Sequence, residues 1–341
     1  MYPAAYDAGR SRKNHDEFTF QNWSDGGEIM HYAFLHMSEF FTQAIIYRSG
    51  PISGLTSNPD KDIASLTVET HLGEMTIDDY VEQGPVDGVV IVRSGEVVYE
   101  RYPRMRPFDK HLLMSVSKIF VSTVIGILED EGKVDSSAPI DRYLPELSGS
   151  GWEGVSVRDI LDMASGIDCL ESDEPGAYSD PSTAYYQYEA SPAGLRRPPR
   201  RWNQPTHISR RSAAGVNRAR PSNTRRRTRS LSWLAERVTG QLFNEIVTDM
   251  LWSRIGAESD ALVSTSRVGA PASHGGISAT VRDVARLGLL FTPSWNVVAD
   301  ESIISATHMR RIQEEGRPGI FDSRGRPVND RVVARRATAL Q

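Results

Sequence analysis

The chain has 341 residues, a formal net charge of −5 and a hydrophobic content of 39%. It contains no run of about 18 apolar residues, which excludes a transmembrane helix and indicates a globular protein with one large domain or two lobes. No apolar segment follows the charges of the N-terminal sequence MYPAAYDAGRSRKNHDE, so we expect no secretory signal and a cytoplasmic location. Cys169 is the only cysteine and therefore forms neither an internal disulfide nor a CxxC metal site.

The charge is distributed very unevenly along the chain. Residues 191–229 contain twelve arginines but no lysine and no acidic residue. The rest of the chain carries 27 basic and 44 acidic residues, a net charge of −17. The whole sequence has only five lysines against 34 arginines, which indicates coding DNA rich in G and C. An acidic protein thus contains one basic segment, and that segment needs its own explanation.

The first half of the chain predicts a polar arm, a hairpin and a buried helix, in that order. The first 30 residues are polar, and we expect them to form a loose arm. Residues 87–103, DGVVIVRSGEVVYERYP, alternate apolar and polar side chains around Ser94 and Gly95, which predicts two antiparallel strands. The next segment, SVSKIFVSTVIGILEDEG, is apolar on most faces and ends at Gly132, so we predict a buried helix with a glycine C-cap.

The second half is rich in helix signals. Ser156 with Asp159, and Thr280 with Asp283, have the spacing of helix N-caps before SVRDILDMASGI and TVRDVARLGLLF. Two more helical segments, SLSWLAERVTG and LFNEIVTDMLWSRIG, meet near Gly240. Gly275 and Gly276 indicate a turn before the last helix, and the order predicts an α+β protein with a sheet completed by C-terminal strands. After Gly316, however, the sequence has little strand periodicity.

Ser115 and Lys118, in HLLMSVSKIF, are the candidate catalytic residues. Their spacing of three places both side chains on one face at the start of the apolar helix. Burial there lowers the pKa of a lysine, and the neutral amine can take the serine proton while the serine oxygen attacks a carbonyl. The serine amide at the helix N-terminus can donate to the resulting oxyanion. The alternative is an ordinary serine and lysine, because an SxxK pattern is short enough to occur by chance.

Several ordered blocks resemble the serine β-lactamase and penicillin-binding-protein-like hydrolases. They are HLLMSVSK, DEGKVD, DRYLPEL, VRDILDMASGI, SWLAERVTG and GGISATVRDVARLG, and they are most similar to the 6-aminohexanoate-dimer hydrolase branch, which has esterase and amidase activities. The likeness spans roughly 32–190 and 230–315. It implies a β-lactamase/transpeptidase-like fold, with an antiparallel sheet flanked by helices beside an all-helical lobe. It also implies that Ser115 is the acylated nucleophile, that Lys118 is its base, and that the substrate is a small amide or ester.

The sequence departs from the family pattern in two places. The family has a tyrosine followed shortly by an asparagine before the helix that begins near Ser230, but PSNTRRRT stands there, and no tyrosine follows Tyr188. The family also has a Lys- or His-containing strand ending in glycine, and none is recognisable after Gly316. We therefore expect a loose arm at 1–30, a hydrolase domain at 31–315 interrupted by an aberrant segment at 191–229, and an aberrant tail at 316–341.

A shifted reading frame explains the arginine-rich segment. When the codons of Pro221 to Thr228 are read from their third base, they can spell Phe-Glu-Tyr-Pro-Ser-Ala-Asn, which looks like the missing family block. We interpret residues 191–229 as family sequence translated out of frame, with the frame restored by Ser230. The alternatives are a basic surface loop and a nucleic-acid-binding segment. Nucleic-acid binding is disfavoured because Trp202 is the segment's only aromatic residue, so no stacking pattern accompanies the charges.

These observations predict a serine hydrolase that acts through an acyl-enzyme on Ser115. We expect impaired turnover and poor folding, because the tyrosine and the C-terminal strands of the pattern are missing. A catalytically inactive family member acting as a binding module is the main alternative, and an arginine-rich nucleic-acid-binding protein is a weaker one. We expect no cofactor and no metal, since the eight histidines show no ligand spacing. Nothing in the sequence indicates a particular substrate or oligomeric state.

Overall fold

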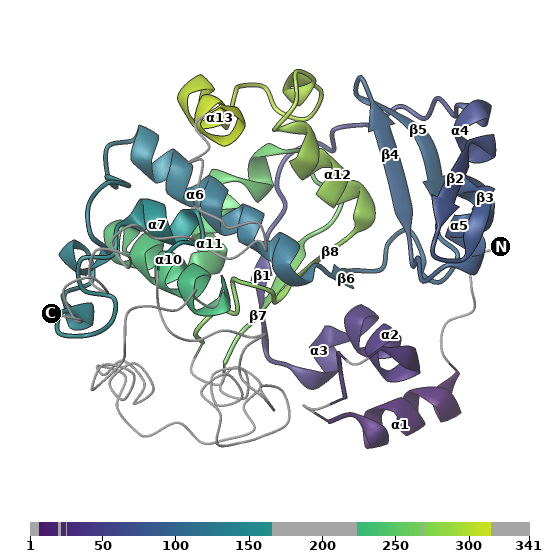
Figure 1. The fold of residues 1–341 in the computed structure, drawn as a ribbon, viewed down its shortest axis with the longest axis horizontal. Coiled ribbons are helices and arrows are strands. Elements are labelled where there is room, and N and C mark those ends of the chain that lie inside the picture. Colours follow the sequence, from purple (N-terminus) through teal and green to yellow (C-terminus); the bar gives the residue numbers. More distant parts are fainter. Residues whose placement is uncertain (1–6, 20–21, 25, 166–223, 267–268, 315–341) are drawn as a thin grey trace, which may run out of the picture.

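A four-stranded antiparallel sheet lies at the centre of the protein (Figure 1). The computed structural model describes residues 7–19, 22–24, 26–165, 224–266 and 269–314, except for the side chains of 224–229. The strand order is β1-β7-β8-β6, and the strands are β1 (Gln43–Ile46), β7 (Ala261–Ser264), β8 (Ile277–Ala279) and β6 (His111–Leu112). Segments more than 200 residues apart therefore pair directly, as Ala44 does with Val263.

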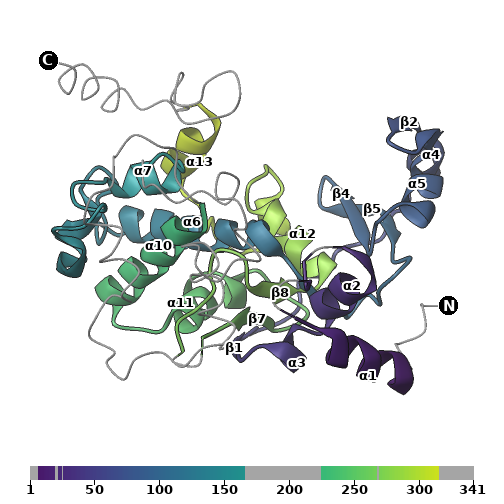
Figure 2. The same cartoon turned by 60° about the horizontal axis from the view of Figure 1, so that its bottom comes forward.

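The main core lies between one face of this sheet and a group of helices. Ile46, Val263 and Ile277 alternate onto that face and are fully buried. The helices are α6 (Lys118–Asp130), α7 (Val157–Leu161), α10 (Thr224–Thr239) and α11 (Phe243–Met250), which lie together on one side of the sheet in Figures 1 and 2. The rings of Phe120 and Trp252 meet at 5.6 Å inside this core. Burial of the apolar faces of these helices is what holds the helical lobe to the sheet.

The structure confirms the helices that the sequence predicts in these regions. Helix α6 is followed by Gly132, whose φ of 71° is the left-handed C-cap conformation that glycine adopts without strain. Ser156 and Thr280 cap helices α7 and α12 (Val281–Leu289), each accepting a hydrogen bond from the backbone N–H three residues on. Helices α10 and α11 are separated at Gly240, which also has a positive φ.

The predicted hairpin is also confirmed. Strands β4 (Val89–Arg93) and β5 (Glu96–Arg101) pair through a tight turn in which Ser94 and Gly95 both have positive φ. A small unit that the sequence did not predict lies beside the hairpin in Figures 1 and 2. It consists of α4 (Lys61–Ser65), β2 (Thr67–Thr70), β3 (Gly73–Thr76) and α5 (Ile77–Gln83).

Three short helices form the N-terminal region, which we expected to be a loose arm as far as residue 30. They are α1 (Ala8–Glu17), α2 (Gly27–Leu35) and α3 (Met37–Phe40). Asp7 caps α1 by accepting hydrogen bonds from two backbone N–H groups. Arg10 and Asn14 of α1 both donate to the Glu28 carboxylate of α2, at 3.1 and 3.2 Å. These polar contacts help to hold the segment in place, although its sequence shows no apolar periodicity.

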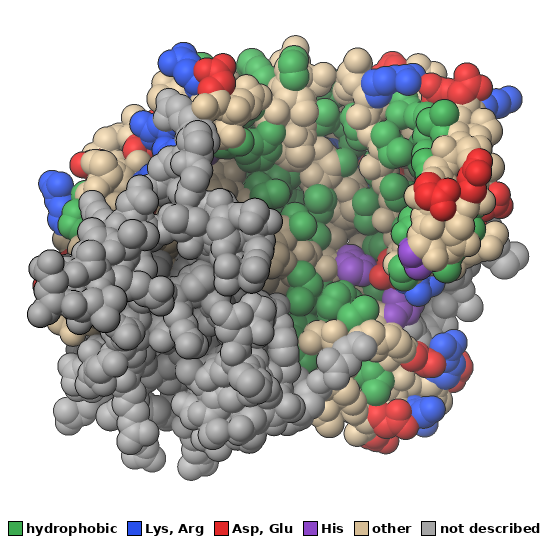
Figure 3. Space-filling model, in the orientation of Figure 1, with side chains coloured by type: hydrophobic (Ala, Val, Ile, Leu, Met, Phe, Trp, Pro, Cys, Tyr) green, Lys and Arg blue, Asp and Glu red, His purple; other side chains and the backbone are tan. Residues whose placement is uncertain are grey.

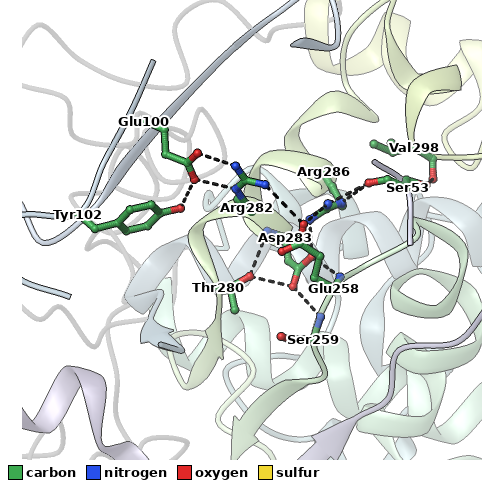
Figure 4. Close-up of polar contacts among 10 residues, drawn as sticks. All are labelled: Ser53, Glu100, Tyr102, Glu258, Ser259, Thr280, Arg282, Asp283, Arg286 and Val298. Carbon is green, nitrogen blue, oxygen red and sulfur yellow. Dashed lines mark hydrogen bonds and ion pairs between the residues drawn. The ribbon is translucent and has the colours of Figure 1, made fainter. Parts of the chain in front are cut away.

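A network of ion pairs connects helix α12 both to the β4-β5 hairpin and to the main core (Figure 4). The fully buried Arg286 pairs with Asp283 at 2.9 Å and with Glu258 at 2.6 Å. Arg282 forms a two-bond ion pair with Glu100 of β5, at 2.7 and 2.6 Å. Because one helix face holds both arginines, α12 connects the hairpin to the main core.

The remaining elements are short. Helix α13 (Ala306–Gln313) contacts α6 through an ion pair between Arg311 and Glu129. The 3₁₀ turns are η1 (Met114–Ser117), η2 (Ile140–Arg142), η3 (Pro145–Leu147), η4 (Trp252–Arg254) and η5 (Trp295–Val297). Among the helices of the described residues, none is long and apolar enough to cross a membrane. The C-terminal strands that we expected would follow residue 314, outside the described residues.

Candidate active site

Ser115 and Lys118 are in direct contact at the N-terminal end of α6. Ser115 lies in η1 and is exposed, and Lys118 is half-buried as the first residue of α6. The Lys118 Nζ atom lies 2.6 Å from the Ser115 Oγ atom, which is hydrogen-bonding distance. The structure therefore brings together Ser115 and Lys118, whose spacing of three residues predicted that they share one face of the helix.

A backbone carbonyl holds the lysine in this position. Lys118 Nζ donates a hydrogen bond to the carbonyl oxygen of His274 at 3.1 Å, and His274 is only 4% exposed. The amine is thus fixed between the serine hydroxyl and one buried carbonyl. Sequence reasoning missed this second contact, because a backbone carbonyl carries no residue signature.

Strand β8 holds the turn that presents Ser115. Leu113 donates its N–H to the Ile277 carbonyl at 2.8 Å, and the Ile277 N–H donates to the Ser117 hydroxyl at 3.1 Å. Between these bonds, Met114 has a φ of 45°, a conformation that costs most side chains free energy. Contacts on both sides of Met114 therefore keep the strained turn in place.

Gly276, just before β8, lies in a tightly packed turn. A Cβ atom on Gly276 would lie 2.7 Å from the Ala272 Cβ atom, which is too close for any side chain. A Cβ atom on Gly275 would lie 3.7 Å from the Met114 carbonyl carbon, which is an ordinary contact. Nearby, the buried Ser273 hydroxyl donates to the Ser232 hydroxyl of α10 at 2.9 Å. The Gly-Gly pair, which the sequence indicated as a turn before a helix, is also the site of a close backbone contact.

Two apolar side chains close to Ser115 in the sequence stay exposed. Val116 of η1 and Ile119 of α6 are 43% and 39% exposed, although the other apolar residues of α6 are mostly buried. Figure 3 shows that hydrophobic side chains line a hollow in the middle of one face of the protein. Exposed apolar groups of this kind are compatible with a ligand that has apolar carbon atoms.

Four features of the sequence lie wholly or mostly outside the described residues. The missing tyrosine block was expected at about 220–225, and Cys169, Trp202 and most of the arginine-rich segment fall in the same undescribed region. Within the described ranges, no group of three or more His, Cys, Asp or Glu side chains could hold a metal ion.

The protein has the β-lactamase/transpeptidase-like fold, in which helices flank an antiparallel sheet. Its Ser-Lys pair lies where the sheet meets the helical lobe. The Beta-lactamase family model matches residues 74–329, so the chain belongs to that family. The 6-aminohexanoate-dimer hydrolase of Paenarthrobacter ureafaciens is 30% identical over 94% of this chain and 80% of that protein. A Beta-lactamase of Providencia stuartii is 36% identical over 21% of this chain and 19% of its own length.

A solved structure shows the same fold. It belongs to a Bacillus anthracis protein provisionally assigned as a 6-aminohexanoate-dimer hydrolase. The TM-score is 0.73 at 21% identity, and the match covers 92% of this chain and 81% of that one. By family, the chain is a serine hydrolase related to 6-aminohexanoate-dimer hydrolase.

Proposed function

We propose that this chain cleaves a small amide or ester through an acyl-enzyme on Ser115, with Lys118 as the base. The observation that carries the proposal is the 2.6 Å contact between Lys118 Nζ and Ser115 Oγ. A neutral amine at this distance can accept the hydroxyl proton as the oxygen attacks. The name of the Paenarthrobacter relative supports a linear amide, and the exposed Val116 and Ile119 are compatible with an alkyl chain.

The proposed reaction has two stages. In the first, Ser115 Oγ bonds to the substrate carbonyl carbon, and its proton moves to Lys118. The tetrahedral intermediate then expels the amine or alcohol, which receives that proton from the lysine ammonium. In the second stage, water hydrolyses the acyl-enzyme and releases the acid. The oxyanion forms near the start of the 13-residue helix α6, where the helix dipole favours negative charge.

We propose that turnover is impaired. The family pattern places a tyrosine hydroxyl beside the lysine for proton transfer, and this sequence has no tyrosine after Tyr188. We propose no nucleic-acid partner for residues 191–229.

Ester hydrolysis by matched serine variants tests this function. Ser115→Ala is expected to abolish cleavage of a nitrophenyl ester. Ser122→Ala is the control, because Ser122 lies on the same helix and its hydroxyl donates only to the Ile119 carbonyl. Equal rates for wild type and Ser115→Ala would overturn the assignment. A stable wild-type protein without any ester cleavage or serine labelling would favour an inactive binding module.

A further inference from the structure

A second cluster of ionisable groups includes His111, on the strand that leads into the nucleophile turn. The carboxylate of Asp87, just before β4, contacts three basic groups. His111 Nε2 of β6 lies 2.8 Å from its Oδ2 atom, and Arg104 lies 2.7 Å from Oδ1. His31 Nε2 of α2 lies 3.4 Å from Oδ1. One carboxylate, with its side chain 17% exposed, thus joins α2, the hairpin and the central sheet.

His111 joins the Asp87 carboxylate to the backbone of β6. Its Nε2 atom lies 2.8 Å from the Asp87 carboxylate, and its Nδ1 atom lies 2.8 Å from the Leu112 carbonyl oxygen. The imidazole ring thus bridges a carboxylate and a backbone carbonyl.

His111 is well placed to control the geometry of the serine turn. Strand β6 is two residues long and forms the edge of the four-stranded sheet, paired only to β8 among its described neighbours. Met114, which has a positive φ, and Ser115 follow this strand after a single intervening residue, Leu113. A short edge strand before a strained turn needs additional anchors, and the bond from His111 to the Leu112 carbonyl is such an anchor.

We propose that Asp87 and His111 are positioning residues for Ser115, with the imidazole ring of His111 linking the Asp87 carboxylate to the backbone that enters the nucleophile turn. This role rests on the proposed function of Ser115. Neither residue touches the serine or the lysine in the described contacts. They act by fixing the path from Leu112 to Met114, and hence the distance between Ser115 and Lys118.

The other groups around the carboxylate have separate tasks. Arg104 extends from the segment after β5 and makes the second ion pair with Asp87. Burial lowers the pKa of His31 below its usual value, outweighing the nearby Asp87, so His31 is neutral at neutral pH. The ring of Phe34 meets the His111 ring edge to face at 5.7 Å. Among the contacts described for this cluster, the one from His111 reaches the backbone of β6.

Two glutamine variants separate positioning from simple loss of an imidazole. His111→Gln removes the ring that bridges Asp87 and the Leu112 carbonyl, while His31→Gln removes the other imidazole on the same carboxylate. A serine-directed acylating probe is expected to react about 10-fold to 100-fold more slowly with His111→Gln, since small misplacements of reacting groups have effects of that size. His31→Gln should stay within about twofold of wild type. Equal acylation rates in the two glutamine variants would overturn the role.

Hydrogen exchange provides a readout that needs no activity. Backbone amides of residues 112–117 are expected to exchange faster in His111→Gln than in wild type, and at wild-type rates in His31→Gln. Unchanged exchange in His111→Gln contradicts the positioning role even if acylation falls. If wild type does not react with the probe at all, the proposed function fails, and the exchange comparison still decides whether His111 anchors the turn.

Discussion

Lys118 is an ionisable residue at the start of a mostly apolar helix, and two of its contacts explain its place there. Its amine contacts the Ser115 hydroxyl and the His274 carbonyl. Lys118→Met keeps the side-chain length but removes the base, so we expect acylation of Ser115 to fall by about 10²- to 10⁴-fold, the usual contribution of general-base catalysis. The thermal midpoint should stay near that of wild type, because methionine suits an apolar helix.

Lys133→Met is the matched control for this change. Lys133 pairs with Glu131 on the exposed surface at 2.8 Å and lies one helix length away from the serine. Acylation by Lys133→Met should equal that of wild type. Normal acylation by Lys118→Met would remove the lysine from the mechanism.

Gly126 is the point where α13 packs against α6. A Cβ atom there would clash with the ring of His308. We expect Gly126→Ala to lower the free energy of unfolding by about 1–3 kcal/mol, the usual cost of overpacking. Gly288→Ala is the control: no atom lies within 4 Å of its added Cβ in helix α12, so it should stabilise by up to about 1 kcal/mol. Equal denaturation midpoints for the two variants would contradict the described packing.

Some residues of the site were predictable from the sequence and others were not. The Ser115 and Lys118 pair follows from spacing and an apolar helix. The His274 carbonyl and the Asp87 anchor do not, because they depend on the pairing of β6 with β8 and on segments that are distant in sequence. The Gly-Gly pair was the one local sign that two backbones meet at this place.

At the scale of elements, the ion pair between Glu100 and Arg282 links the hairpin to α12. Burial alone would raise the pKa of Glu100, but hydrogen bonds from Arg282 and Tyr102 outweigh it and hold the pKa below its usual value. A carboxyl whose pKa is lower in the folded state contributes stability above its unfolded-state pKa. That contribution is lost as pH falls through the folded-state value.

Acid titration of matched variants checks this linkage. Glu100→Gln should be less stable than wild type at neutral pH and should lose less stability on acidification below about pH 4.5. Glu69→Gln, on the exposed strand β2, should follow the wild-type acid slope. The same acid slope in Glu100→Gln as in wild type would show that the ion pair does not contribute.

Helices and the hairpin were predictable, but most of the central sheet was not. Caps at Ser156 and Thr280, and the Ser94-Gly95 turn, are local signals that the structure confirms. Strands β1, β7 and β8 have three or four residues each, too few for a period of two to stand out. Their pairing comes from long-range packing against α6 and α11, which no local pattern encodes.

At the scale of the whole molecule, we interpret the arginine-rich segment at residues 191–229 as family sequence translated out of frame. Sequencing the gene on independent templates across codons 185–235 tests whether residues 191–229 are translated out of frame. We predict that another frame spells a Tyr-x-Ser-Ala-Asn block at about residues 221–228. If no frame spells such a block, the basic segment is native and the interpretation is wrong.

The family prediction depended on the order of several sequence blocks along the chain more than on any one motif. An SxxK pattern alone is weak, whereas six blocks in order predicted a family that the match over residues 74–329 shows. Composition and charge could not have given this result, because they describe an acidic globular protein of any fold. The order of blocks succeeds because it reflects the order of packed elements around one sheet.

The central claim is that Ser115 becomes acylated, and mass spectrometry of the intact protein after reaction with a slowly hydrolysed ester tests it most directly. We predict one added acyl group, located by peptide mapping on Ser115 and absent from Ser115→Ala. An unmodified protein, or an acyl group on another residue, would contradict the proposed mechanism.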